Sequence, residues 1–182
     1  RQMCIRDSYW EMMFEQQGKR PVPHGTQVGV GTVLVLKLVE ALRSASVDFD
    51  AARTAAKAYD PRLWEEHIRT AYGPAAQGVI DMEAKAKKNG TAGRLRRIDA
   101  IEQHWPEITE LLASLPASRT VMELLRSLDA PCLPAEIGVG EEMLRNTFYY
   151  CKEVRARYTI LQMIWDLGLL EPLAEEVIGE LR

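Results

Sequence analysis

The stretch RPVPHGTQVGVGTVLVLKLVEAL, residues 20–42, decides the fold because it holds the longest apolar run in the chain and its periodicity is ambiguous. Its centre, VGVGTVLVLKLV, is rich in β-branched residues and fits a buried strand as well as a buried helix. A strand without a partner leaves its backbone groups unpaired, whereas a helix pairs its own. The apolar run also continues to Leu42, a helical length of about four turns or more. We therefore predict a central helix from Thr26 to Leu42.

Five valines and two glycines give this helix a low intrinsic propensity, so tertiary packing must hold it. Gly25 and Gly29 lie on one side of the predicted helix. We expect them to allow another backbone to approach closely.

Downstream of residue 45 the sequence predicts helices almost throughout, because apolar residues recur at spacings of three and four. The clearest is DPRLWEEHIRTAYG, in which Asp60 is a natural N-cap, Pro61 fits the first helical position and Gly73 ends the helix. Further helices are predicted at residues 74–89, 93–105, 107–115 and 118–128, with one or two helices over residues 141–165 and a short one from residue 172. No alternating strand pattern is found elsewhere. The predicted fold class is all-α, a single multi-helix domain.

Three side-chain expectations belong to these helices. The helix after residue 93 is expected to turn its arginines to solvent: Arg94, Arg96 and Arg97. Leucines are expected to continue the apolar stripe of the two helices that follow: Leu111, Leu112, Leu115, Leu124, Leu125 and Leu128. Thr120 and Glu123 have the spacing of a capping box at the start of the second of these helices.

The composition describes a globular domain of 182 residues, too short for two enzyme domains of ordinary size. A net charge of -3 lacks the basic excess that favours nucleic acid or anionic membranes, so we expect neither partner. Cys4, Cys132 and Cys151 form no CxxC pair, which predicts neither a disulfide framework nor a thiolate zinc site. The stretch from Val28 to Leu36 is about half a membrane span, and no signal-peptide core is seen. These features predict a cytoplasmic protein.

His24 is the candidate for chemistry, since it stands between Pro23 and Gly25 at the start of the central helix. Its imidazole is either aimed into a cleft as a metal ligand or is a helix-capping, partly buried side chain, and one histidine alone does not decide between them. His67 and His104 lack the HExxH spacing and are expected to be solvated. The GVGT segment lacks the third glycine of a dinucleotide fingerprint.

The segment KEVRARYTILQMIWDLGLL places cations beside an aromatic ring and admits two interpretations. Lys152, Arg155 and Arg157 with Tyr158 could form an anion-binding face. The favoured interpretation is a core helix whose basic side faces solvent.

Four stretches together resemble a known family: PHGTQVGVGT, AYGPAAQGVIDME, IEQHWPEI and RYTILQMIWDLGLLE. They are similar to the C-terminal helical domain of the sn-glycerol-1-phosphate dehydrogenases, within the superfamily of iron-containing alcohol dehydrogenases, glycerol dehydrogenases and dehydroquinate synthases. The resemblance covers residues 9–182 in the same order.

The resemblance implies a two-domain enzyme that reduces dihydroxyacetone phosphate, a small phosphate substrate, to sn-glycerol 1-phosphate. An N-terminal domain, absent here, would bind NAD(H) or NADP(H), and residues 9–182 would be the helical metal and substrate domain. His24 matches a ligand of the family's divalent metal, with zinc expected first and nickel or iron as alternatives. An aspartate and an earlier histidine complete that ligand set. A homo-oligomer is compatible with the family.

The N-terminus departs from the family pattern. Where the family has EHxxSH, this chain reads RQMCIRDS, with Cys4 and Ser8 in the places of the two histidines. Residues 1–8 are therefore expected to be non-native and the chain to be an inactive fragment. Two alternatives remain: a fragment of a related glycerol dehydrogenase or dehydroquinate synthase-like enzyme, or a non-catalytic helical binding module.

Overall fold

The computed structural model describes residues 5–20 and 22–182, and within these ranges all regular structure is helical. The α-helices are α1 (Ile5–Gln16), α2 (His24–Ser44), α3 (Phe49–Lys57), α4 (Pro61–Tyr72), α5 (Ala76–Ala86), α6 (Thr91–Gln103), α7 (Trp105–Ser114), α8 (Ser118–Ser127), α9 (Glu141–Tyr150), α10 (Ile160–Asp166) and α11 (Leu170–Glu180). Three short 3-10 helices join them: η1 (Gly73–Ala75), η2 (Pro134–Ile137) and η3 (Cys151–Glu153). The all-α prediction is confirmed.

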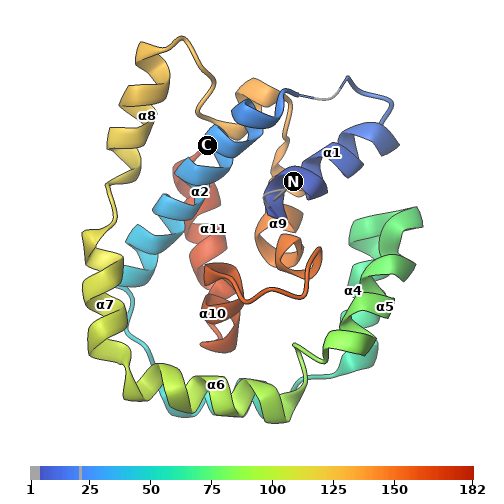
Figure 1. The fold of residues 1–182 in the computed structure, drawn as a ribbon, viewed down its shortest axis with the longest axis vertical. Coiled ribbons are helices and arrows are strands. Elements are labelled where there is room, and N and C mark those ends of the chain that lie inside the picture. Colours follow the sequence, from blue (N-terminus) through green and yellow to red (C-terminus); the bar gives the residue numbers. More distant parts are fainter. Residues whose placement is uncertain (1–4, 21) are drawn as a thin grey trace.

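The ambiguous apolar run is helix α2, which crosses the middle of the molecule and packs against α1, α7, α8 and α11 (Figure 1). Its buried side chains include Val30, Val33, Leu34, Leu38, Val39 and Leu42. The predicted central helix from Thr26 to Leu42 is confirmed. By length and composition α2 could also span a membrane, but more than half of its apolar window is buried inside the structure, as in the core helix of a globular protein.

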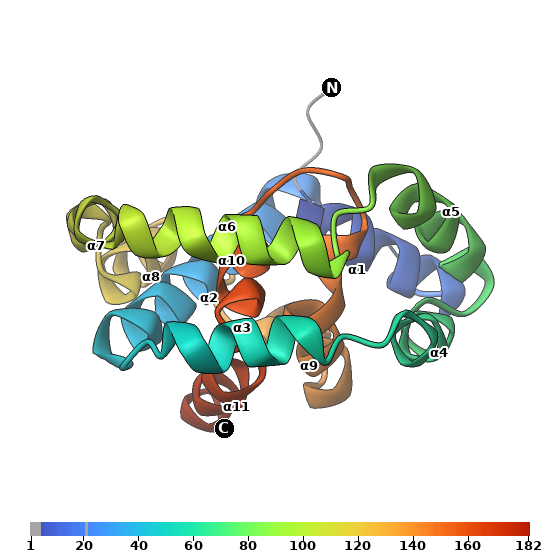
Figure 2. The same cartoon turned by 90° about the horizontal axis from the view of Figure 1, so that it is seen from below.

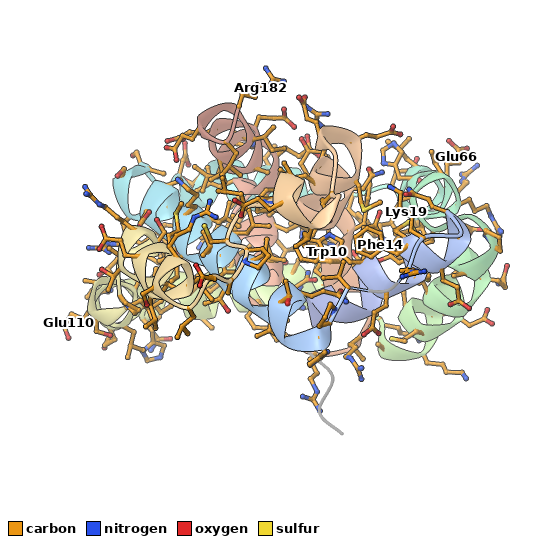
Figure 3. The ribbon with its side chains drawn as sticks, turned by 90° about the horizontal axis from the view of Figure 1, so that it is seen from above. Trp10, Phe14, Lys19, Glu66, Glu110 and Arg182 are labelled. Carbon is orange, nitrogen blue, oxygen red and sulfur yellow. The ribbon has the colours of Figure 1, made fainter. Side chains whose placement is uncertain are left out.

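The other helices surround this core as a frame. Helices α3 and α6 lie side by side along one edge, α4 and α5 form one end, and α7 and α8 form the other (Figures 1 and 2). Helix α1 packs its aromatic side chains inward, with Trp10 Nε1 donating to Thr147 Oγ1 of α9 at 2.8 Å. Trp10 and Phe14 point into the core, whereas Glu110 and Arg182 extend outward (Figure 3).

Gly25 and Gly29, two of the three glycines of α2, differ in their surroundings. A Cβ on Gly29 would lie 3.2 Å from Leu125 Cδ2 of α8, so this glycine admits a leucine side chain. A Cβ on Gly25 would meet no atom within 4 Å. The expected approach of another backbone is therefore wrong at both positions, because Gly29 faces a leucine side chain and Gly25 faces open space.

The predicted ends of α4 are confirmed. Asp60 Oδ1 accepts a hydrogen bond from Arg62 N at 2.8 Å, Pro61 is the first helical residue, and Gly73 follows the last turn with a φ of 52°. That left-handed value favours glycine because it has no Cβ to clash.

The predicted capping box of α8 is wrong. The N-cap is Ala117, which has no side-chain acceptor. Instead Glu40 of α2 accepts from Ser118 N at 2.6 Å and from Ser118 Oγ at 2.7 Å. A carboxylate from a neighbouring helix thus satisfies the first free amide of α8, where local sequence cannot show it.

The leucine stripe is also only partly correct. Four of these leucines are exposed: Leu111, Leu115, Leu124 and Leu128. Helices α7 and α8 pack mainly against α2 at one side of the molecule (Figure 1). Each buries few side chains, and the leucines that flank the contact are left in solvent.

Residues 141–165 are interrupted rather than continuously helical. Helix α9 ends at Tyr150, η3 follows, and α10 starts after Thr159, whose Oγ1 accepts from Gln162 N at 3.3 Å. The interruption turns the chain so that Lys152 and Glu153 face the interior.

Candidate metal ligand and ligand-binding cavity

His24 is the first residue of α2, directly after Pro23, whose φ of -50° fits the entry into a helix. Its side chain is 49% exposed, and its Nδ1 lies 4.0 Å from Oε1 of Glu11 on α1. The two helix faces that meet here therefore present one imidazole and one carboxylate. Both are groups that divalent metals bind in proteins.

The described residues do not complete a metal site. Among the side chains that the structure describes, those of residues 9–20 and 22–182, no group of three histidines, cysteines, aspartates or glutamates is placed to hold a metal ion. His67 on α4 and His104 in the turn between α6 and α7 are exposed, as predicted. Cys4 lies outside the described residues, and for Ser8 the structure describes only its place in α1. His24 therefore fits a metal as one ligand of a larger set.

A cavity of about 370 Å³ opens elsewhere, between α4, the α9–η3 junction, α10 and the start of α11. His24 and Glu11 are not part of it. Its walls are rich in rings: Tyr59, Trp64, His67, Tyr149, Tyr150 and Trp165. The volume falls in the range of small-molecule sites, whose walls are mainly apolar and aromatic with a few buried polar groups.

One buried polar group at this cavity is Glu153, which is 3% exposed. Its carboxylate accepts from Lys152 Nζ, from Asn89 Nδ2 at 3.0 Å and from Trp64 Nε1 at 3.3 Å. Lys88 Nζ lies 3.1 Å from Oε2. Burial alone would raise the pKa of Glu153, but the two lysines outweigh it and hold the pKa well below its usual range.

A second buried carboxylate, Asp166, organises the arginines of α6. Arg97 donates to it through Nε at 2.6 Å and Nη2 at 2.9 Å, and Tyr158 OH donates at 3.1 Å. Arg94 Nε lies 3.4 Å from Oδ1. The bidentate contact is the strong form of an arginine–carboxylate pair.

Trp165 lies between the two clusters and forms part of the cavity wall. The guanidinium carbon of Arg94 is 3.6 Å from a ring centroid of this indole, and Lys152 Nζ is 4.2 Å from one. Two cations thus lie against one indole ring, where cation–π attraction stabilises them. Both are largely removed from water, and this burial lowers the pKa of each.

These buried cations correct two expectations. Lys152 does not belong to a solvent-facing basic side, and Arg94 and Arg97 do not face solvent, although Arg96 and Arg157 do. Glu153 and Asp166 supply the opposite charges that make burial tolerable. One feature of the sequence could have indicated this burial: Asp166 is the single acidic residue in the apolar segment QMIWDLGLL. A carboxylate in such a segment implies a buried cation as its partner.

Three curated proteins match most of the chain, and each is named glycerol-1-phosphate dehydrogenase [NAD(P)+]. The match to the Geobacillus stearothermophilus enzyme is 24% identical over 164 residues, 90% of this chain and 32% of the enzyme. The Geobacillus thermodenitrificans and Bacillus licheniformis enzymes are 21% and 24% identical over 90% and 91% of this chain. The chain resembles the glycerol-1-phosphate dehydrogenases.

The chain spans about a third of the length of these glycerol-1-phosphate dehydrogenases. No family model and no solved structure matches it. The matched third corresponds here to a purely helical structure over the described residues, with one exposed histidine at the start of its central helix. This extent agrees with the resemblance seen over residues 9–182.

Proposed function

We propose that this chain is the C-terminal helical domain of an NAD(P)-dependent glycerol-1-phosphate dehydrogenase, a cytoplasmic enzyme that reduces dihydroxyacetone phosphate to sn-glycerol 1-phosphate. The observation that carries the proposal is the match of nine-tenths of the chain to three enzymes of that name. The all-helical structure supports it, since nucleotide binding then falls to the remaining two-thirds of such an enzyme.

His24 is the metal ligand that this domain contributes. Its place at the first turn of a helix anchored by the core fixes the backbone, while half of the side chain stays open to solvent. Glu11 Oε1 lies 4.0 Å from His24 Nδ1, so a carboxylate is close enough to help orient the imidazole. The other ligands come from outside the described residues.

The metal, zinc or else nickel or iron, supplies positive charge that polarises the substrate carbonyl when it is bound. The chain's own part is positional. Helix α2 is long and buried, so His24 at its end is held against a rigid core rather than on a mobile loop.

A chimeric enzyme tests the proposal. This chain would replace the matching third of the Geobacillus stearothermophilus enzyme, and oxidation of NADH or NADPH would be followed with dihydroxyacetone phosphate. We expect turnover that depends on the substrate. A chimera with native helix content and no turnover would contradict the proposal.

The chain by itself is the control. With the nucleotide, a divalent metal and the substrate we expect no turnover, because the described residues include neither a nucleotide-binding unit nor a complete metal site. A rate clearly above the reaction without protein would refute the assignment of this chain as one domain of a two-domain enzyme.

A further inference from the structure

The cavity between α4 and α10 combines a buried positive charge with an aromatic wall. Four cations are buried or mostly buried at or behind its floor: Lys88, Arg94, Arg97 and Lys152. Two fully buried carboxylates, Glu153 and Asp166, oppose them. Glu83, about half-buried, is a third carboxylate nearby, and its Oε1 accepts from Asn89 N at 2.6 Å. The four cations at or behind the floor outnumber these three carboxylates by one, and Lys152 and Arg94 are the two that line the cavity itself.

Carboxylates also occur at the mouth of the cavity, where Asp60 and Glu171 are exposed. Water screens exposed charges far more than buried ones, so these two oppose an incoming anion only weakly. Asp60 is in addition held by its cap bond to Arg62 N. The buried cations dominate the interior of the cavity.

Two of these cations have hydrogen-bonding capacity to spare. Within the described part of the chain, Lys152 Nζ donates only to Glu153, although an ammonium has three donors. Arg94 donates to Trp165 O at 3.1 Å through Nη2, and its buried Nε makes no hydrogen bond to the described residues although it lies 3.4 Å from Asp166 Oδ1 as an ion pair. Buried donors without acceptors are costly, and an oxyanion supplies acceptors together with the missing charge.

We propose that this cavity binds a small organic oxyanion, with its carboxylate or phosphate group at Lys152 and Arg94 and its apolar body against the rings of Trp64, Trp165 and Tyr59. A single aromatic ring with a charged substituent suits a volume of about 370 Å³. The proposal does not rest on the proposed function, because His24 is outside the cavity and binding needs neither metal nor nucleotide.

An NMR titration of the ¹⁵N-labelled protein, followed through the indole N–H signals of its tryptophans, measures such binding directly. Two of its four tryptophans, Trp64 and Trp165, form part of the cavity wall, whereas Trp10 and Trp105 do not. Benzoate and phenyl phosphate are the probes. Inorganic phosphate, which has no ring, is the control for the apolar body, and benzylamine, which is a cation, is the control for the charge.

We expect benzoate or phenyl phosphate to shift the Trp64 and Trp165 signals saturably and to leave those of Trp10 and Trp105 in place. Inorganic phosphate should bind at least about tenfold more weakly, because it lacks the apolar body. Benzylamine should shift neither signal. If benzoate binds and phenyl phosphate does not, the anion is a carboxylate, and the reverse result identifies it as a phosphate.

A pair of exposed substitutions avoids disturbing the buried charges. Leu63 is a half-exposed residue of α4 on the cavity wall, and Leu124 is similarly exposed on α8, away from it. Leu63→Glu should weaken binding of the probe by about threefold or more, because it removes apolar surface from the cavity wall and adds a partly screened like charge there. Leu124→Glu should leave it unchanged.

The proposal is overturned if neither anion shifts the Trp64 and Trp165 signals, or if benzylamine shifts them as strongly as benzoate. Equal affinity of the Leu63→Glu variant and the parent protein would also overturn it. Circular dichroism of both variants confirms that each comparison is made between folded proteins.

Discussion

At the scale of single residues, Glu153 holds a buried negative charge against two lysines, an amide and an indole N–H. Replacing it by glutamine leaves Lys152 buried without a counter-charge. We therefore expect Glu153→Gln to lower the free energy of unfolding at neutral pH by about 3–5 kcal/mol. Denaturant titration would measure this. The matched substitution Glu123→Gln, at an exposed ion pair, should cost less than about 1 kcal/mol.

The same carboxylate sets a dependence of stability on pH. Its pKa is lower in the folded protein than in the unfolded chain, so its stabilisation is present above the unfolded value, about 4.3, and is lost as the pH falls further. The parent protein should lose stability more steeply than Glu153→Gln between about pH 4.5 and pH 2. Parallel slopes for the two proteins over this interval would show that Glu153 is not charged in the fold.

The sequence predicts single residues only where their role is local. It correctly placed His24 at the start of a helix and Asp60 as a cap, because both depend on neighbours in sequence. It misplaced Arg94 and Lys152, because helical periodicity assigns every cation to solvent. Arg94 is buried against Asp166 and Trp165, which are distant in sequence. Lys152 is buried because the helix is interrupted after Tyr150.

At the scale of elements, α8 depends on a cap from another helix. Glu40 accepts two hydrogen bonds at the start of α8, so Glu40→Ala should destabilise the protein by about 1–2 kcal/mol. Thr120→Ala removes the side chain that sequence spacing had suggested as the cap and should change stability by less than about 0.5 kcal/mol. Thermal unfolding of the two variants compares them directly. A larger loss from Thr120→Ala than from Glu40→Ala would contradict the capping seen here.

The packing of α2 against α8 depends on the absence of a side chain at Gly29. Leu125 already fills the space beside it, so Gly29→Leu should cost about 1–3 kcal/mol by overpacking. Gly25→Leu is the matched control, since its side chain would enter open space and leucine favours helix. Chemical denaturation of both variants measures the difference. Equal stabilities would show that α2 and α8 do not pack closely at this point.

The helices themselves were predictable because strong apolar periodicity and terminal residues such as Asp60 and Gly73 act within a few positions. The break between α9 and α10 was not. The sequence allowed one helix or two over residues 141–165 but did not place the interruption, which turns Lys152 and Glu153 inward and so depends on tertiary contacts.

At the scale of the whole molecule, the other helices surround α2 (Figures 1 and 2). His24 is not among the residues that line the aromatic cavity, so the two candidate sites are separate. The fold class followed from the sequence, since the ambiguous apolar run had no partner strand. Whether His24 has further ligands could not be predicted in the same way, because ligands converge from distant parts of a chain, and the described side chains offer no group of three around it.

The central claim is that His24 supplies a metal ligand in a glycerol-1-phosphate dehydrogenase. The most direct test is the ratio of bound metal to protein in the chimeric enzyme and in its His24→Ala and His104→Ala variants. We predict that the His24→Ala variant loses most of its bound metal and its activity while keeping its helix content. The His104→Ala variant, which replaces an exposed histidine in the turn between α6 and α7, should keep its metal, its activity and its helix content. Unchanged metal content and turnover in His24→Ala would show that His24 takes no part in metal binding.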